Sequence, residues 1–209
     1  MGVTSYESVI AGNFLQPLTL LVAKLVERSR DSTPGKTNET ELDWALPAIL
    51  LTVVMFESYL GWIQRRGATG VDVEKSAYNF YEKLRQKYQE LPDVTEAFIL
   101  RGIIAHNRVW SVDFQWVESD DILSISHIAG GDNKWERNVD KTKGTTASGL
   151  HIIPTLIERS DVKAVLSIVV AAMEALITVK ALLPQALTHV AVWPGGRSVS
   201  LRELPAQIA

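Results

Sequence analysis

One stretch of the chain combines a permanent cation with a titratable imidazole in otherwise apolar surroundings. Residues 100–108 read Leu-Arg-Gly-Ile-Ile-Ala-His-Asn-Arg, with Arg101 and His106 five positions apart. On a helix, this spacing sets the two side chains about 140° apart around the axis, so they flank Gly102 and Ala105 without stacking on each other. A guanidinium holds a phosphate and an imidazole exchanges protons near neutral pH. The pattern therefore points to chemistry on a phosphate, with two ordinary polar residues at the rim of a helical bundle as the alternative.

Several other chemistries lack the residues that they need. Cysteine is absent, which removes disulfides, thiolate metal sites and thiol nucleophiles together. The chain has no Gly-rich phosphate loop, no H-E-x-x-H pattern and no G-x-S-x-G pattern. None of its four histidines follows an acidic residue by three positions, as metal sites in helical bundles require. We therefore expect neither a bound metal nor a cofactor.

Two carboxylates stand alone in long apolar stretches. They are Glu57 and Glu174. Because a buried carboxylate without a partner is costly, each is expected to find a cation or to reach the surface. We expect Glu57 to pair with Arg101 or His106 and to fix its rotamer, and Glu174 to lie at a solvent-facing edge of its helix.

A third group of residues fits contact with RNA. Lys134, Trp135 and Arg137 join an aromatic ring to cations. Aromatic stacking combined with local positive charge suits single-stranded RNA. Acidic residues dilute the charge of this stretch, so a plain solvated loop is the alternative.

Hydrophobic periodicity predicts a mainly helical chain. Helices are expected at about 6–28, 40–66, 73–90, 94–110 and 160–183. Alternation with period two over 111–117 and 122–126 predicts a β-hairpin, residues 130–149 a surface loop, and residues beyond about 190 an irregular tail with one short strand or turn at 190–193. The fold class is thus all-α: one domain over 1–209, with about five helices and an inserted hairpin and loop at about 111–150.

Composition narrows the classes of partner and compartment. The chain carries 21 Lys and Arg against 24 Asp and Glu, a formal net charge of −3, so it does not coat nucleic acid through bulk charge. Residues 44–56 and 164–183 approach the length of a membrane span, but charged residues interrupt or adjoin both. The start of the chain lacks the cationic region of a secretory signal. We expect a cytoplasmic protein that does not enter a membrane.

The motif Leu-Arg-x-x-Ile-Ala-His-Asn at residues 100–107 resembles the signature of HEPN domains. These are small helical bundles found in prokaryotic toxins, phage-defence proteins and RNA-processing nucleases. The stretch Phe-Glu-Ser-Tyr-Leu at 56–60 is similar to the helix that often precedes the Arg–His helix in that family. The resemblance covers about residues 40–110 and the final long helix, and departs from many active members at Gly102, where they carry a polar residue.

The resemblance implies an HEPN-like endoribonuclease that needs no metal. The ribose 2′-OH would attack the adjacent phosphorus, with His106 as general base or acid and Arg101 holding the phosphate. Asn107 would orient the imidazole or contact a non-bridging oxygen, and Arg108 would add an RNA contact. In the family the cleft is usually shared across a homodimer, so a second copy is an expected partner, through the Arg101–His106 helix. An antitoxin protein is a further partner that the resemblance raises.

Two other functions remain open at the level of sequence. The same groove could serve a non-catalytic HEPN-like module that binds RNA, a nucleotide or a protein. Alternatively, the chain is an unrelated helical bundle that acts only as an oligomeric scaffold.

Overall fold

The described part of the chain folds into a bundle of helices with three small strand pairs. The computed structural model describes residues 10–31, 39–67, 69–106, 110–113, 124–127, 138–140, 144–152, 156–180, 187 and 189–208. The helices are η1 (Ile10–Phe14, 3-10), α1 (Leu15–Asp31), α2 (Glu39–Arg66), α3 (Ala77–Lys87), α4 (Thr95–His106), α6 (Arg159–Lys180), η3 (Leu201–Glu203, 3-10) and α8 (Leu204–Gln207). The described strands pair antiparallel as β1 (Trp110–Asp113) with β2 (Ser124–His127), β3 (Val139–Asp140) with β4 (Gly144–Thr145), and β5 (Val190–Val192) with β6 (Ser198–Ser200). The expected all-α class is confirmed.

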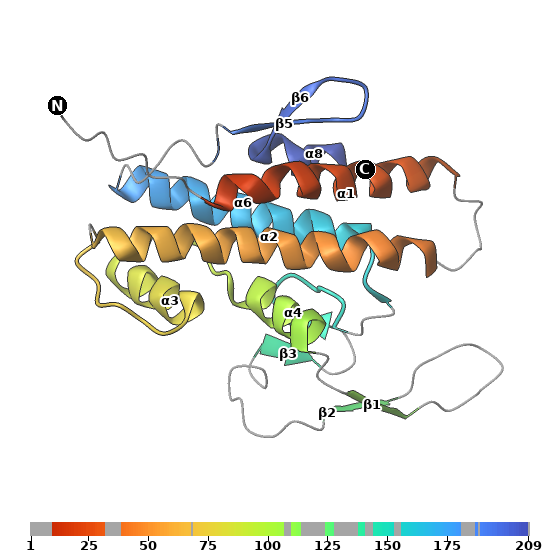
Figure 1. Cartoon of the computed structure of the whole chain (residues 1–209). Helices are drawn as coiled ribbons and strands as arrows, with labels where there is room; N and C mark the ends of the chain where they lie inside the picture. Colours follow the sequence, from red (N-terminus) through yellow and green to blue (C-terminus); the bar gives the residue numbers. More distant parts are fainter. Residues whose placement is uncertain are drawn as a thin grey trace.

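The central element is α2, the longest described helix. It packs against α1, α6, α3 and α4, and crosses the front of the molecule between α1 and the pair α3 and α4 (Figure 1). Its 28 residues extend about 42 Å at 1.5 Å per residue. Because several helices cover it, α2 is apolar around most of its circumference, which is why its sequence reads almost as a continuous hydrophobic run.

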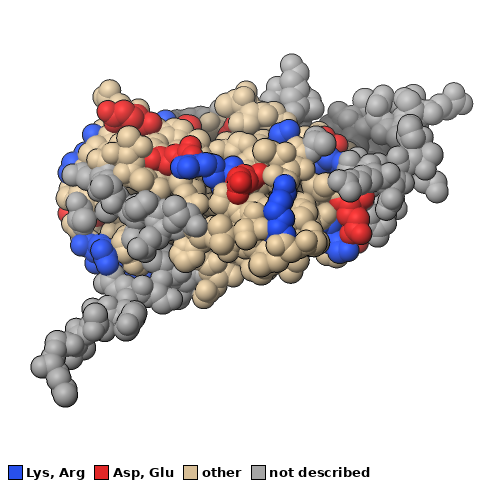
Figure 2. Space-filling view, turned by 90° about the horizontal axis from the view of Figure 1, so that it is seen from above, with Lys and Arg blue, Asp and Glu red and all other residues tan. Residues whose placement is uncertain are grey.

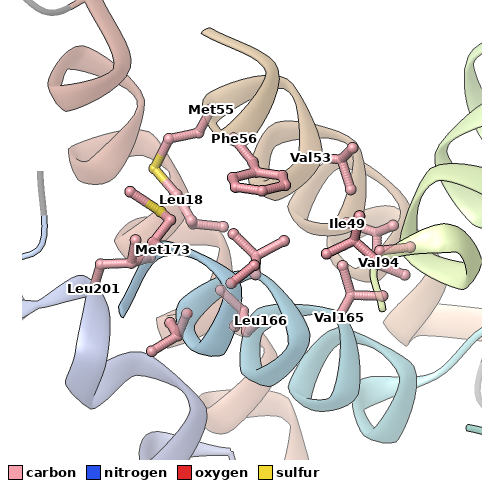
Figure 3. Packing of buried hydrophobic residues seen from close by; sticks show 14 of the residues in the cluster. Leu18, Ile49, Val53, Met55, Phe56, Val94, Val165, Leu166, Met173 and Leu201 are labelled. Atoms are coloured by element: carbon pink, nitrogen blue, oxygen red, sulfur yellow. The ribbon is translucent and has the colours of Figure 1, made fainter. Parts of the chain in front are cut away.

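Segments far apart in the chain meet in one hydrophobic core (Figure 3). Leu18 of α1, Phe56 of α2 and Leu166 of α6 have no exposed surface, and Leu201 of η3 joins them from the C-terminal region. Burying a side chain of this size stabilises the fold by roughly 1.5–3 kcal/mol. The long helices are thus held mainly by this shared core.

The predicted helices are present, but their ends differ from expectation. The first helix is preceded by the 3-10 turn η1 and then runs as α1 to Asp31. Pro17 lies in the first turn of α1, where its missing N–H has no intrahelical partner to lose. The third helix is shorter than predicted, because Ser76 caps it by accepting a hydrogen bond from the Asn79 N–H at 3.1 Å.

The prediction of a helix through residue 110 is wrong at its end. The described residues of α4 are Thr95–His106, and Trp110 lies in β1, where it pairs with His127. The expected antiparallel pairing of the segment after the helix is confirmed, with Ser111 opposite Ser126. Pairing with β2 therefore places Trp110 in a strand, although the local pattern predicted a helix up to this residue.

Two regions predicted to be irregular contain packed structure. The loop predicted for 130–149 includes β3 and β4, and Gly144 and Thr145 are buried. The predicted short strand near residue 190 is confirmed as β5, but the rest of the tail is not irregular. It returns as β6 through a turn with positive φ at Gly195 and Gly196, and ends in α8, which packs on α1 and α6. Such short elements carry too little periodicity to be recognised locally.

Two of the described helices are long and apolar enough to cross a membrane by length and composition alone. They span Glu41–Arg66 and Arg159–Val179, and 56% and 44% of their apolar windows are buried inside the protein. Core helices of soluble proteins pass the same test, so a location in the cytoplasm remains a prediction.

Candidate active site

An ion pair between α2 and α4 forms the centre of the candidate site. The Nη2 of Arg101 donates to Oε2 of Glu57 at 3.2 Å. About a quarter of each side chain is exposed, 26% for Arg101 and 25% for Glu57, so both side chains are largely shielded from solvent and the Nε of Arg101 is buried. The predicted partnership between Glu57 and Arg101 is therefore present. It joins residues 44 positions apart in the chain.

An aromatic cluster beneath this pair sets the position of α4 on α2. Phe56, next to Glu57, packs at a ring-centroid distance of 6.2 Å from Phe98, one turn before Arg101. Phe56 also meets Tyr81 of α3 edge to face at 5.5 Å. Rings in these arrangements contribute beyond the area that they bury. The cluster fixes the backbone positions from which Glu57 and Arg101 reach each other.

The surface beside Arg101 on α4 is shallow. Ile103 is buried, whereas Gly102 retains part of its exposure and Ala105 is exposed. His106 is the last described residue of α4 and lies about 7.5 Å beyond Arg101 along the axis.

Several predicted site residues fall outside the part of the chain that the structure describes. They are Asn107, Arg108, Lys134, Trp135 and Arg137. Their assigned roles, and that of the His106 side chain, remain predictions. The other isolated carboxylate, Glu174, accepts a hydrogen bond from Nε of Arg202 at 2.6 Å and is 41% exposed, in agreement with its expected place at a solvent-facing edge.

Sequence reasoning missed the role of Glu96, which holds a turn against the first turn of α4. The side chain is only 6% exposed, and its two oxygens accept the backbone N–H groups of Ala147 and Ser148 at 2.6 and 2.8 Å. A carboxylate there also interacts favourably with the positive end of the helix dipole. Its acidic type at the start of a helix was visible in the sequence, but the distant turn that it binds was not.

A second missed arrangement lies at the start of α6. Asp161 is 2% exposed and accepts hydrogen bonds from the backbone N–H groups of His151 and Glu158, both at 2.8 Å. Its Oδ2 also lies 2.9 Å from Nδ1 of His151. The two side chains stand ten positions apart in the chain, and no local sequence pattern predicts their contact. Close by, Arg159 forms an ion pair with the buried Glu41 of α2.

Ionisable groups next to α4 have altered proton affinities. Burial raises the pKa of Asp93, but hydrogen bonds from Thr95 and the nearby Arg85 guanidinium outweigh it and leave the pKa below its usual range. Burial raises the pKa values of Tyr59 and Tyr81 well above that of an ordinary phenol. Both phenols therefore stay neutral at physiological pH, so neither is a suitable base next to the pair.

A cavity of about 590 Å³ lies apart from the pair, among α1, the β5–β6 turn and α8. Two cations line it, but Lys24 is bound to Glu27, and Arg197 lies over the Trp193 ring and donates to Gln207. Figure 2 looks down on this side of the molecule, where acidic and basic side chains are interspersed. Because the charge is mixed, the described residues on this side do not form the basic track expected of a nucleic-acid surface.

Among the described residues, no group of three His, Asp or Glu side chains could hold a metal ion. Comparison of the chain with protein-family models, with curated proteins and with solved structures finds no match. The protein is therefore an all-α bundle with a partly shielded Glu57–Arg101 ion pair on the adjoining helices α2 and α4.

Proposed function

We propose that this protein is a metal-independent endoribonuclease of the HEPN-like type, acting as a toxin or phage-defence effector in the cytoplasm. The observation that carries the proposal is the Glu57–Arg101 ion pair, because Arg101 belongs to the Arg-x4-His motif that sequence alone selected. An arginine that a carboxylate holds in place, with about one quarter of its side chain exposed, is suited to bind a phosphate group.

In the proposed reaction, the ribose 2′-oxygen attacks the adjacent phosphorus and the bond from phosphorus to the 5′-oxygen breaks. The 2′-OH proton passes to a base, and the leaving 5′-oxygen takes a proton from an acid. The products are a 2′,3′-cyclic phosphate and a 5′-hydroxyl. Arg101 stabilises the negative charge that builds on the phosphate oxygens, and Glu57 is a positioning residue that holds the guanidinium.

His106 supplies the proton transfer in this proposal. Neutral and protonated imidazole are both populated near pH 7, so one side chain type can act as base or acid. Asn107 and Arg108, which follow it directly, are assigned to orienting the imidazole or contacting phosphate. A second copy of the chain would contribute the same residues again.

The test is cleavage of a mixture of structured and single-stranded RNAs in the presence of a chelator, followed by chemical mapping of the new ends. Wild type is expected to leave 2′,3′-cyclic phosphate and 5′-hydroxyl ends, and not to cut DNA of the same sequence, which lacks the nucleophile. We expect Arg101→Ala to lower the rate by about 10²–10³-fold and His106→Ala by about 10²–10⁴-fold.

The matched control is Arg202→Ala, which removes an arginine from another ion pair, with Glu174. This variant should cleave as wild type does. If no RNA is cut under any condition while RNA is still retained, the nuclease proposal fails and the non-catalytic RNA-binding module takes its place.

A further inference from the structure

The outward side of α2 has a regular composition that none of the proposed catalytic steps uses. Its inward positions, such as Ile49, Phe56 and Ile63, have no exposed surface. The outward positions retain exposure and recur at steps of three and four residues, which keeps them on one side of a helix. They are Asp43, Pro47, Leu50, Val54, Ser58, Gly61 and Arg65, and we call them the α2 seam.

The α2 seam carries opposite charges at equal distances on either side of Val54. Asp43 lies eleven residues before Val54 and Arg65 eleven residues after it. Eleven residues are close to three full helical turns, about 16 Å along the axis. Both ends are exposed, and neither side chain makes an ion pair within the described part of the chain. A second, antiparallel copy of α2 centred on Val54 would place Asp43 against the partner's Arg65, twice.

The seam is also complementary in size about the same centre. Pro47 and Gly61 lie seven residues on either side of Val54, and Leu50 and Ser58 four residues on either side. In the antiparallel arrangement each larger apolar residue meets a smaller one, which lets the two helices approach closely. A Cβ added at Gly61 would have no atom within 4 Å, so the space above it is open.

We infer that the α2 seam is a self-association surface, through which two copies of this chain pack with their α2 helices antiparallel around Val54. The inference stands whether or not the protein cleaves RNA. A two-fold axis makes each contact occur twice. One acidic and one basic residue in each chain, Asp43 and Arg65, would therefore form two ion pairs between the copies. The apolar centre supplies the area removed from water, and the charged ends fix the direction of the partner helix.

If the proposed function also holds, this dimer has a consequence for the site. Glu57 lies three residues from Val54, so the two copies of Glu57 would stand about 9 Å apart along the helix axes. The two Glu57–Arg101 pairs would then border one shared surface. The contact would lie on α2, beside the Arg101–His106 helix that the family resemblance favoured.

The test measures the mass of the protein in solution without RNA, by sedimentation or light scattering over a range of concentrations. Wild type is expected at twice the chain mass of 23.1 kDa. Asp43→Arg and Arg65→Asp each bring like charges together twice and should yield monomers. Mixed in equal amounts, the two variants should recover a dimer, because each mixed pair then joins an acid with a base at both ends.

The charge variants change exposed positions, so they leave the fold intact, which circular dichroism verifies. Val54→Asp should also yield a monomer, whereas its control Val73→Asp, at a valine 75% exposed outside α2, should remain a dimer. Wild type that is monomeric at all concentrations would overturn the inference. So would single variants whose dimer is lost but not recovered on mixing, or monomers that bind anionic lipid vesicles through the same residues.

Discussion

The Glu57–Arg101 ion pair can be tested by a double-mutant cycle of Glu57→Ala, Arg101→Ala and the two combined. A hydrogen bond to a charged group contributes about 1.5–3 kcal/mol when well buried, and exposed ion pairs about 0.2–1 kcal/mol. Because one quarter of each side chain is exposed, we expect a coupling free energy of about 1 kcal/mol. For a domain of this size, that corresponds to a fall in Tm of about 2–4 °C for each single variant.

The same cycle separates positioning from structure when RNA cleavage is measured. If Glu57 acts only by holding Arg101, Glu57→Ala should lower kcat about tenfold in the wild-type background and have no effect once Arg101 is alanine. Thermal melts and single-turnover cleavage give the two readouts. Additive effects on both stability and kcat, with a coupling below about 0.3 kcal/mol, would refute this reasoning. The Glu174–Arg202 pair provides the control cycle, and its removal should leave kcat unchanged.

Three further predictions concern stability. Asp161→Ala leaves three buried or partly buried donors without their acceptor. The free energy of unfolding, measured by chemical denaturation, should therefore fall by about 3–5 kcal/mol. A loss below about 1 kcal/mol would contradict the assigned contacts. Gly144→Ala should destabilise strongly, because φ is +104° and an added Cβ would lie 2.3 Å from the Leu150 carbonyl oxygen; a melting temperature equal to wild type would disprove this. Asp93 has a lowered pKa in the folded protein, so the stability that it contributes is present above about pH 4 and is lost as the pH falls through the folded pKa. The difference in unfolding free energy between wild type and Asp93→Asn should therefore shrink with acidification. A difference that stays constant with pH would contradict this role of Asp93.

The long helices were predictable because their signals are local. The apolar run that becomes α2 and the Gly67 that ends it, at a φ of +63°, were sufficient to place the helix within a residue or two. The strand pair after α4 was equally visible in its alternating pattern. By contrast, η3, α8 and the pair β3 and β4 are too short to show a period, and only their packing stabilises them.

Sequence by itself determined the helical class, the absence of thiol chemistry and the choice of Arg101 and His106 as candidate residues. Those conclusions depend on composition and on spacing within a few turns of helix. Tertiary structure decided that Arg101 takes Glu57 as a partner, that Glu96 holds a distant turn, and that His151 meets Asp161. The reason is physical: these contacts depend on how whole helices pack across the core, and no local pattern encodes which faces will meet.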